Sequence, residues 1–261
     1  MKTFSWQFDA YGDPSHNLQW REQELDEPGP GQALVKIKAV GMNRSEFNYA
    51  RGNYIPARQF PSAIGQELVG EIIALGAAAT SGPQAYRNTP LRVGATVAVV
   101  PGRIDMCSMG SYRQFGLYEQ SALVPIPDNY SPEEGAAYWM AILTAAGCLE
   151  QAGISPDTAK GKRILVTAAS SGIGIMALKL ARAWGATTIA TTRSLAKTAQ
   201  LKQLADHVVL CSDSNSLIAG VNNAIGDLGV NVSLDPVGEA FYPGLIAVSA
   251  NGGIIVSYEM I

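Results

Sequence analysis

The first half of the chain consists of short apolar runs that turn residues interrupt. The first six residues alternate apolar and polar side chains, as β-strands do. Further apolar runs are bounded by turn-forming stretches such as Pro28-Gly29-Pro30-Gly31. This pattern predicts an irregular all-β domain over residues 1–130, with strands at 33–40, 67–75, 95–100 and 121–124.

The pattern changes at Ser131-Pro132-Glu133-Glu134. A serine that can cap a helix, a proline in the first helical position and a glutamate three residues after the cap together mark a helix start. The following stretch is rich in Ala, Met and Leu, and we predict a buried connecting helix that runs to about Ala152. The second domain is expected to occupy residues 131–261.

From Lys162 onward, apolar runs of strand length alternate with segments of helical length. This alternation predicts a parallel sheet with right-handed crossovers, and the uninterrupted apolar strands indicate that helices cover both of its faces. The fold class is therefore α/β, with a doubly wound parallel sheet after the β domain. The predicted strands are 163–167, 187–192, 207–210, 230–235 and 253–257, and the predicted helices are 172–184, 195–205, 214–225 and 239–250.

A turn of small residues joins the first of these strands to its helix. Small residues let the backbone approach a pyrophosphate, and the N–H groups of the first helical turn donate to it. Ala169 and Ser171 replace the first two glycines of the usual dinucleotide fingerprint, whereas Gly174 keeps the third, where helix packs closely on strand. An unrelated small-residue turn is the alternative, but the strand–turn–helix context favours a Rossmann dinucleotide site. The expected cofactor contacts are Ala169, Ser170, Ser171, Gly172, Ile173 and Gly174.

The second strand ends in Thr191-Thr192-Arg193-Ser194, and Lys197 follows. NAD-binding domains place an acid about twenty residues after the fingerprint to bond the ribose hydroxyls. Because no acid is present here, nothing repels a 2′-phosphate, and Arg193 can pair with one through charge-assisted hydrogen bonds. We predict NADPH as the cofactor, with contacts from Thr192, Arg193, Ser194 and Lys197. Alternatively, Arg193 and Lys197 are solvated surface charges.

The fourth strand closes with Asp235-Pro236-Val237-Gly238, at the carboxyl edge of the sheet. Ligands bind at this edge in open α/β folds. We therefore expect Asp235, Val237 and Gly238 to contribute to the cofactor site, with the alternative that Asp235 only forms the turn.

Composition and charge narrow the range of partners. The formal charge of -3 and pI of about 5.5 argue against a basic face that binds nucleic acid or an anionic membrane. Cys107, Cys148 and Cys211 are widely scattered, which excludes a disulfide framework and favours a reducing compartment. Charges or glycines interrupt every apolar run, and the first residues lack signal-peptide features. The sequence predicts a cytoplasmic protein.

A series of short motifs, weak one by one, is specific in its order and spacing. The motifs are Gly41-Met42-Asn43, Arg51-Gly52-Asn53-Tyr54, residues 61–70, Leu143-Thr144-Ala145, residues 168–174 and Asp235-Pro236-Val237-Gly238. Together they resemble the medium-chain dehydrogenase/reductase superfamily, in its zinc-free, zeta-crystallin-like quinone-oxidoreductase branch. The resemblance implies a GroES-like catalytic domain followed by a Rossmann NADP-binding domain.

Departures from the zinc-using members of this family argue against a metal site. Those members carry His where this chain has Gln66, and Cys at or near Asn43, whereas amide side chains are poor zinc ligands. The four-cysteine structural zinc loop is also missing, since Cys107 is alone in its region. His16 and His207 are isolated and are expected to be ordinary surface or strand-edge residues. We predict an enzyme that uses no metal.

The resemblance also implies roles for individual residues. Asn43, Tyr54 and Gln66 would line the cleft near the nicotinamide, and Thr144 would contact the cofactor. Asn43 or Tyr54 would hydrogen-bond the carbonyl being reduced, as in an oxyanion site; alternatively, Tyr54 is a packed loop aromatic. Tyr49 comes one position too late to replace a second tyrosine of some quinone reductases. The implied activity is NADPH-dependent reduction of a quinone, enone or enal.

The sequence leaves two other functional assignments to compare with a metal-free reductase. The turn at 167–174 also resembles that of short-chain dehydrogenases, but neither Tyr242 nor Tyr258 has the lysine four positions on that this family needs. A non-catalytic NADPH-binding sensor or structural relative is the stronger alternative.

The chain stops at Ile261, just after the fifth predicted strand, whereas a doubly wound dinucleotide domain has six. The strand at 253–257 would then form the sheet edge, with no Lys or Pro to discourage pairing. We expect either a homodimer that pairs through this strand or further residues beyond those given.

Overall fold

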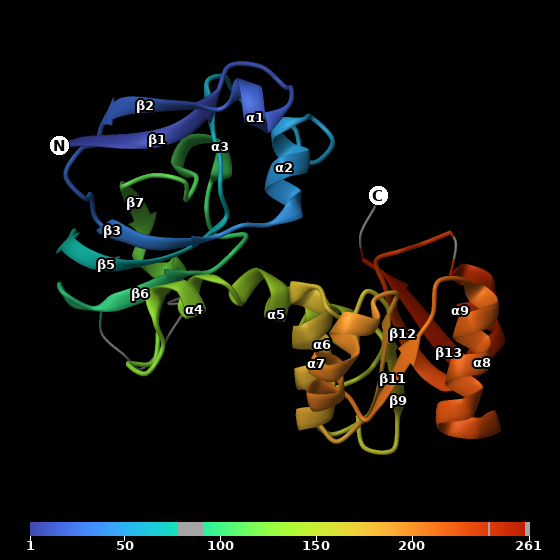
Figure 1. The fold of residues 1–261 in the computed structure, drawn as a ribbon. Helices are drawn as coiled ribbons and strands as arrows, with labels where there is room; N and C mark the ends of the chain where they lie inside the picture. Colours follow the sequence, from blue (N-terminus) through green and yellow to red (C-terminus); the bar gives the residue numbers. More distant parts are fainter. Residues whose placement is uncertain (78–90, 240, 259–261) are drawn as a thin grey trace. The chain divides into compact units, whose positions relative to one another are not determined.

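The structure is a computed structural model that describes residues 1–77, 91–239 and 241–258. It divides into two compact units, Met1–Met140 and Ala141–Ile261, drawn in Figure 1 from blue to green and from yellow to red. This boundary lies ten residues after the predicted one, which falls between residues 130 and 131. The expected chain end at Ile261 and residue 240 of a predicted helix lie outside the described residues.

The first unit contains two antiparallel sheets (Figure 1), one of five strands in the order β7-β3-β5-β6-β8 and one of three in the order β2-β1-β4. Buried side chains such as Val35, Leu68 and Val97 fill the core of the larger sheet. Strands β3, β5, β6 and β8 correspond to the four predicted runs. The strands are β1 (Lys2–Phe8), β2 (Gln19–Glu24), β3 (Gln32–Gly41), β4 (Ser62–Ala63), β5 (Glu67–Leu75), β6 (Thr96–Val99), β7 (Phe115–Glu119) and β8 (Leu123–Pro125).

Short helices interrupt the β structure at α1 (Pro14–Asn17), α2 (Arg44–Ala50), α3 (Met106–Met109) and α4 (Pro132–Ala136), and a 3-10 turn η1 spans Gln120–Ala122. The predicted start of α4 is confirmed: Ser131 Oγ accepts from Glu134 N at 3.1 Å, and Glu134 Oε2 accepts from Ser131 N at 2.9 Å. Strand β2 was not predicted, because it is an edge strand whose residues are mostly polar and exposed.

The prediction of one connecting helix to about Ala152 is wrong. Helix α4 ends at Ala136, and a separate helix α5 spans Trp139–Gln151. Ala136 packs beside Val69 in the core of the first unit. The backbone N–H of Met140 donates to Glu67 Oε1 at 3.0 Å, so a side chain of β5 takes up a free donor in the first turn of α5.

The second unit is a parallel five-stranded sheet in the order β11-β10-β9-β12-β13, which confirms the predicted doubly wound fold. Alternate residues of β9 enter different cores: Ile164 and Val166 pack in one cluster and Leu165 in the other. Both faces of the sheet are therefore covered, which explains the continuous apolar strands. The strands are β9 (Arg163–Val166), β10 (Thr187–Thr192), β11 (His207–Leu210), β12 (Val230–Asp235) and β13 (Ser249–Ser257).

Helices α6 and α7 contribute to one core and α8 and α9 to the other. The last helix is shorter than predicted and β13 begins four residues earlier, since Ser249 already pairs with Val230. None of the helices in the described ranges has the length and apolar character that a membrane crossing requires. The helices are α6 (Gly172–Ala183), α7 (Thr198–Leu204), α8 (Ser214–Ile225) and α9 (Tyr242–Val248), with 3-10 turns η2 (Leu195–Lys197) and η3 (Gly226–Leu228).

Candidate functional site

The turn between β9 and α6 is closed tightly onto the start of the helix. Ser171 caps α6, and its Oγ accepts a hydrogen bond from Gly174 N at 3.1 Å. A Cβ on Gly174 would lie 2.8 Å from the Ala168 and Ala169 carbonyl oxygens, so this position requires glycine. The N–H groups of a first helical turn have no partner inside the helix, which suits the turn to an anionic group.

A cavity of about 660 Å³ opens beside this turn, within the usual size range of small-molecule sites. It lies at the carboxyl ends of neighbouring parallel strands, where the loops after β9, β10, β11 and β12 converge. The described residues that line it are Thr167, Ala168, Ser170, Ser171, Thr191, Thr192, Arg193, Ser194, Lys197, Cys211, Val237 and Phe241.

The charge of this lining is positive. Arg193 and Lys197 are its charged residues, and no described lining residue is Asp or Glu. Lys197 Nζ donates to Ser170 Oγ at 3.2 Å, which joins the loop after β10 to the phosphate turn. Ser194 N donates to Thr192 Oγ1 at 3.1 Å and holds the loop on either side of Arg193. The cavity therefore offers two cations to an anionic ligand.

Asp235 is fully buried at the end of β12, behind the cavity lining. Its carboxylate accepts hydrogen bonds from the Thr167 hydroxyl and from the backbone N–H groups of Val237 (3.2 Å) and Gly238 (2.9 Å). These bonds tie the ends of β9 and β12 together. Asp235 thus stabilises this turn, as the alternative from the sequence has it, and a contact of Asp235 with the cofactor stays a prediction.

The predicted cofactor residues fall into two groups. Those that line the cavity are Ser170, Ser171, Thr192, Arg193, Ser194, Lys197 and Val237, whereas Ala169, Gly172, Ile173, Gly174, Asp235 and Gly238 belong to the same turns without being part of its described lining. Thr144 lies half-buried on α5, also outside that lining. Sequence reasoning did not select Cys211 or Phe241, although Cys211 directly follows a predicted strand at the same sheet edge.

In the first unit, a buried carboxylate connects two of the three predicted catalytic residues. Glu46 of α2 is 2% exposed. Its side chain accepts hydrogen bonds from the backbone N–H groups of Asn43 and Gln66, the latter at 2.9 Å, and from Tyr112 Oη at 3.0 Å. Burial raises the pKa of Glu46, against the opposing effect of these hydrogen bonds. Glu46 was not selected from the sequence, although Asn43 and Glu46 have the spacing of a capping box, which forms at the start of α2.

A second buried carboxylate holds the Asn43 side chain. Glu67 Oε2 accepts from Asn43 Nδ2 at 3.2 Å. Burial also raises the pKa of Glu67, while hydrogen bonds from Met140, Asn43 and Trp139 oppose that rise. Asn43 is thus held through its backbone by Glu46 and through its amide by Glu67. Gln66 uses its own amide to donate to Ser45 Oγ at 3.1 Å.

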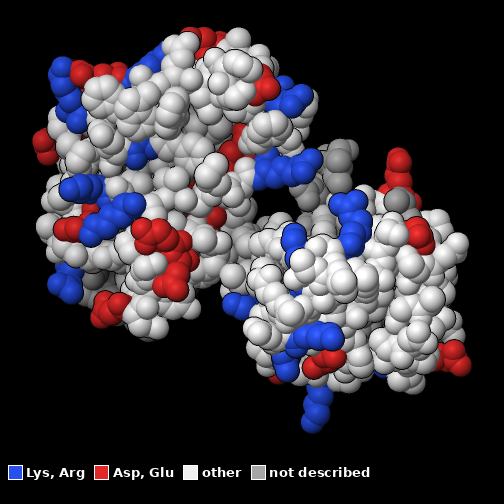
Figure 2. Space-filling model, in the orientation of Figure 1, with Lys and Arg blue, Asp and Glu red and all other residues white. Residues whose placement is uncertain are grey.

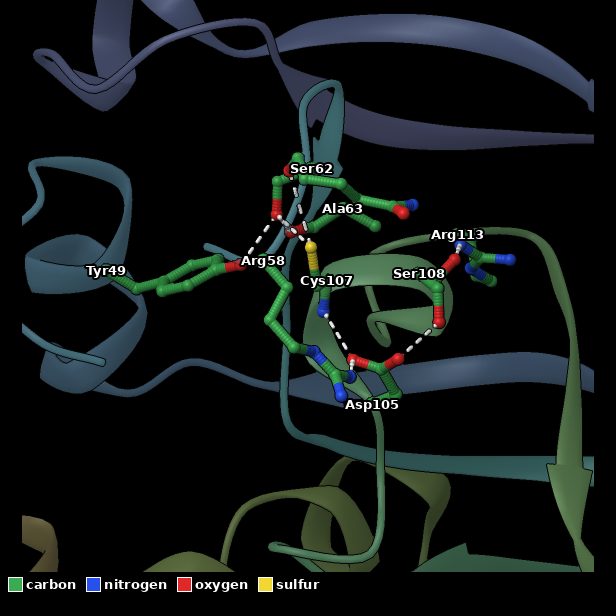
Figure 3. Close-up of polar contacts among 9 residues, drawn as sticks. Tyr49, Arg58, Ser62, Ala63, Asp105, Cys107, Ser108 and Arg113 are labelled. Carbon is green, nitrogen blue, oxygen red and sulfur yellow. Dashed lines mark hydrogen bonds and ion pairs between the residues drawn. The ribbon is translucent and has the colours of Figure 1, made fainter. Parts of the chain in front are cut away.

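The tyrosines of this unit are placed differently from one another. Tyr54, the third predicted catalytic residue, lies in the loop after α2 and is about half exposed. Tyr49 points into the core, where its hydroxyl lies 2.6 Å from Ser62 Oγ (Figure 3). Burial raises the pKa of Tyr49 to about 12. Tyr49 is therefore a core residue and is unsuited to donate a proton to a substrate.

The Ser62 hydroxyl, which contacts Tyr49, also donates to Cys107 Sγ at 3.5 Å (Figure 3). The Asp105 carboxylate accepts from the Cys107 backbone N–H at 3.2 Å. No group of three or more His, Cys, Asp or Glu in the described part of the chain could hold a metal ion.

On the visible face of the first unit, acidic and basic side chains are interspersed, and much of the visible second unit is uncharged (Figure 2).

Two family models match the chain. The model described as "Alcohol dehydrogenase GroES-like domain" matches residues 29–128, and the one described as "Zinc-binding dehydrogenase" matches residues 172–260. The second segment contains a single cysteine, Cys211, and a single histidine, His207.

Curated relatives cover much of the chain. A quinone oxidoreductase of Pseudomonas aeruginosa is 29% identical over 97% of this chain and 72% of its own length. The trans-enoyl reductase tazE of Aspergillus terreus is 31% identical over 68% of this chain, and the match spans 59% of that relative. The chain thus spans about three fifths of the length of the latter.

The fold also matches solved structures. The structure of a quinone oxidoreductase from Pseudomonas syringae pv. Tomato DC3000 superimposes with a TM-score of 0.80 at 29% identity, covering 98% of this chain and 73% of that one. Nearly the whole of this chain therefore has a counterpart in that structure.

Proposed function

The chain belongs to the medium-chain dehydrogenase/reductase superfamily, in its quinone-oxidoreductase-like branch, and we propose that it is an NADPH-dependent reductase that transfers a hydride to a quinone, enone or enal without a metal ion. The family binds a nicotinamide cofactor. The choice of NADPH, the metal independence and the substrate class are the parts that we propose.

The cavity beside the phosphate turn is the observation that carries this proposal. Its described lining combines small turn residues with two cations, Arg193 and Lys197, and no carboxylate. The Ser170–Ser171 turn fits a pyrophosphate at the start of α6, and Arg193 and Lys197 fit a 2′-phosphate. A carboxylate at this place would instead favour the free ribose hydroxyls of NADH.

The chemistry of the first unit supports reduction of an activated carbonyl. When bound, NADPH supplies the hydride from its nicotinamide. Asn43 Nδ2 carries two hydrogens, of which one is donated to Glu67; the second is the candidate donor to a substrate oxygen on which charge develops. Gln66 and Tyr54 are the other candidates for contact with the substrate.

Exposed apolar side chains in the chain segment that carries Asn43 and Tyr54 support an apolar substrate. The segment 42–60, which includes Asn43, exposes five large apolar side chains: Met42, Phe47, Tyr54, Ile55 and Phe60. Apolar surface with a few placed polar groups is typical of small-molecule sites. Among the relatives, the names quinone oxidoreductase and trans-enoyl reductase point to substrates of this kind.

The test is a panel of quinones, enones and enals assayed with NADPH and with NADH. We expect NADPH oxidation with at least one class, and NADPH binding at least ten times tighter than NADH, which corresponds to about 1.4 kcal/mol. Tight NADPH binding without turnover on the whole panel would favour a non-catalytic sensor or structural relative. A homodimer and a cytoplasmic location remain predictions, to be checked by sedimentation and by cell fractionation.

A further inference from the structure

The Asn43 amide is held by a carboxylate from another strand. Glu67 is 2% exposed, and both of its oxygens are engaged: Oε2 accepts from Asn43 Nδ2 at 3.2 Å, and Oε1 accepts from Met140 N at 3.0 Å. The carboxylate therefore has one fixed position between α2 and the first turn of α5.

The backbone around Glu67 leaves space for this carboxylate. A Cβ on Gly41 would lie 2.4 Å from Glu67 Oε2 and 2.3 Å from the Ala136 carbonyl oxygen. Any other residue at position 41 would thus push the carboxylate away from Asn43. The glycine that ends β3 is required here for the space it leaves, since its backbone φ is not in the left-handed region.

An ionised carboxylate accepts hydrogen bonds but does not donate them, whereas a side-chain amide has one end of each kind. Glu67 consequently selects one of the two flipped orientations of the Asn43 amide, with Nδ2 toward the carboxylate. A glutamine at position 67 would be neutral and could both donate and accept, so it would bond the Asn43 amide in either flipped orientation. We propose that Glu67 is a positioning residue that fixes the Asn43 amide with its second N–H available to the substrate oxygen; this rests on the proposed reductase function.

The contacts of Glu46 allow an effect of Glu67 on the Asn43 amide to be distinguished from a general loss of structure. Glu46 holds the backbone N–H groups of Asn43 and Gln66 independently of Glu67. Replacing Glu67 therefore leaves the backbone of Asn43 anchored, and the change acts on the amide orientation.

The experiment compares wild type, Glu67→Gln, Asn43→Ala and the double variant. We expect Glu67→Gln to lower kcat at least tenfold, to leave the NADPH Kd unchanged, and to have little further effect on kcat in the Asn43→Ala background. Asp105→Asn is the matched control. It also converts a carboxylate of the first unit that accepts from a backbone N–H and from a side-chain hydroxyl and pairs with Arg58, and it should leave kcat unchanged.

A second measurement is independent of turnover. The side-chain NH₂ resonances of Asn43, identified by their loss in Asn43→Ala, should shift in Glu67→Gln and stay in place in Asp105→Asn. Unchanged resonances, an unchanged kcat, or equal effects of Glu67→Gln with and without Asn43 would each overturn the positioning role. If wild type reduces no member of the panel, the proposed reductase function fails, and the NMR result still decides whether Glu67 orients the amide.

Discussion

At the residue scale, Arg193 and Lys197 differ in how they are held. Lys197 is joined to the phosphate turn through Ser170, whereas the exposed Arg193 lines the cavity from the loop after β10. A planar guanidinium can bond a phosphate in a bidentate manner, which an ammonium group cannot. Arg193 should therefore contribute more than Lys197 to the recognition of a 2′-phosphate.

Arg193→Ala tests that contribution. We expect the variant to lose most of the preference for NADPH over NADH, through a weaker NADPH Kd and a nearly unchanged NADH Kd, because only NADPH carries the 2′-phosphate. Fluorescence titration with both cofactors measures this. Lys202→Ala, which removes an exposed cation outside the described cavity lining, is the control. An Arg193→Ala variant that discriminates as well as wild type would contradict the assignment.

Ala168 is a second residue with a measurable effect. Its φ of 45° lies in the left-handed region, which costs a non-glycine residue about 1 kcal/mol or more. Ala168→Gly should raise the free energy of unfolding by about 0.5–1 kcal/mol, since glycine adopts this conformation without the Cβ clash. Denaturant titration measures the change. Ala199→Gly, in the exposed part of helix α7, should change stability in the opposite direction by about 1 kcal/mol. A loss of stability in Ala168→Gly would argue against strain at this turn.

At the element scale, Gly174 of helix α6 lies against Ala168 and Ala169 in the turn that follows strand β9. Gly174→Ala would place a Cβ 2.8 Å from the Ala169 Cα, a contact that forces the helix away from the turn. Overpacking of this kind costs about 1–3 kcal/mol, and the shift should also weaken NADPH binding. Gly172→Ala is the matched control for stability, because its Cβ would meet Ala141 at 3.9 Å. Equal unfolding free energies for the two variants would refute the close approach.

At the scale of the whole molecule, the metal-free proposal is open to a direct test. By the resemblance given above, zinc-using members carry His where this chain has Gln66, and Cys at or near Asn43. Here Asn43 Nδ2 donates to Glu67 and Gln66 Nε2 donates to Ser45. We expect purified protein to contain no stoichiometric zinc, and turnover to be unaffected by chelators. Stoichiometric zinc in elemental analysis, or activity lost on chelation and restored by zinc, would count against a metal-free enzyme.

The stability of the whole chain should also depend on Glu67 in a pH-dependent way. Burial raises the pKa of this carboxyl in the folded protein, so the folded state binds its proton more tightly than the unfolded chain does. The contribution to stability is then full below the unfolded pKa of about 4.3 and is lost as pH rises through the raised pKa. Wild type should lose stability relative to Glu67→Gln as the pH rises above the unfolded pKa of about 4.3. Unfolding titrations across this range measure the difference, and a gain would show that the hydrogen bonds outweigh burial.

Local patterns along the chain were sufficient for the second unit. Uninterrupted apolar runs predicted β9 to β12 within one residue, because strands buried on both faces need no alternation. The turn before Gly174 could also be predicted from the sequence. A phosphate turn is one contiguous segment, and close backbone contacts require its residues to be small. In the first unit the same approach located β3, β5, β6 and β8 of the larger sheet. It missed β7 of that sheet and the polar edge strand β2, whose residues bury little.

Only the tertiary structure revealed the buried acids around Asn43 and the partner of Asp235, Thr167, which directly follows strand β9. Glu46 reaches Gln66 across 20 residues, Glu67 reaches Asn43 across 24, and Asp235 reaches Thr167 across 68. Periodicity and motif spacing report the environment of a residue among its sequence neighbours, whereas these side chains gain their function from partners that folding brings within hydrogen-bond distance. A glutamate beside a predicted site residue reads as a surface charge until the fold shows that it is buried, and burial is what makes its hydrogen bonds specific.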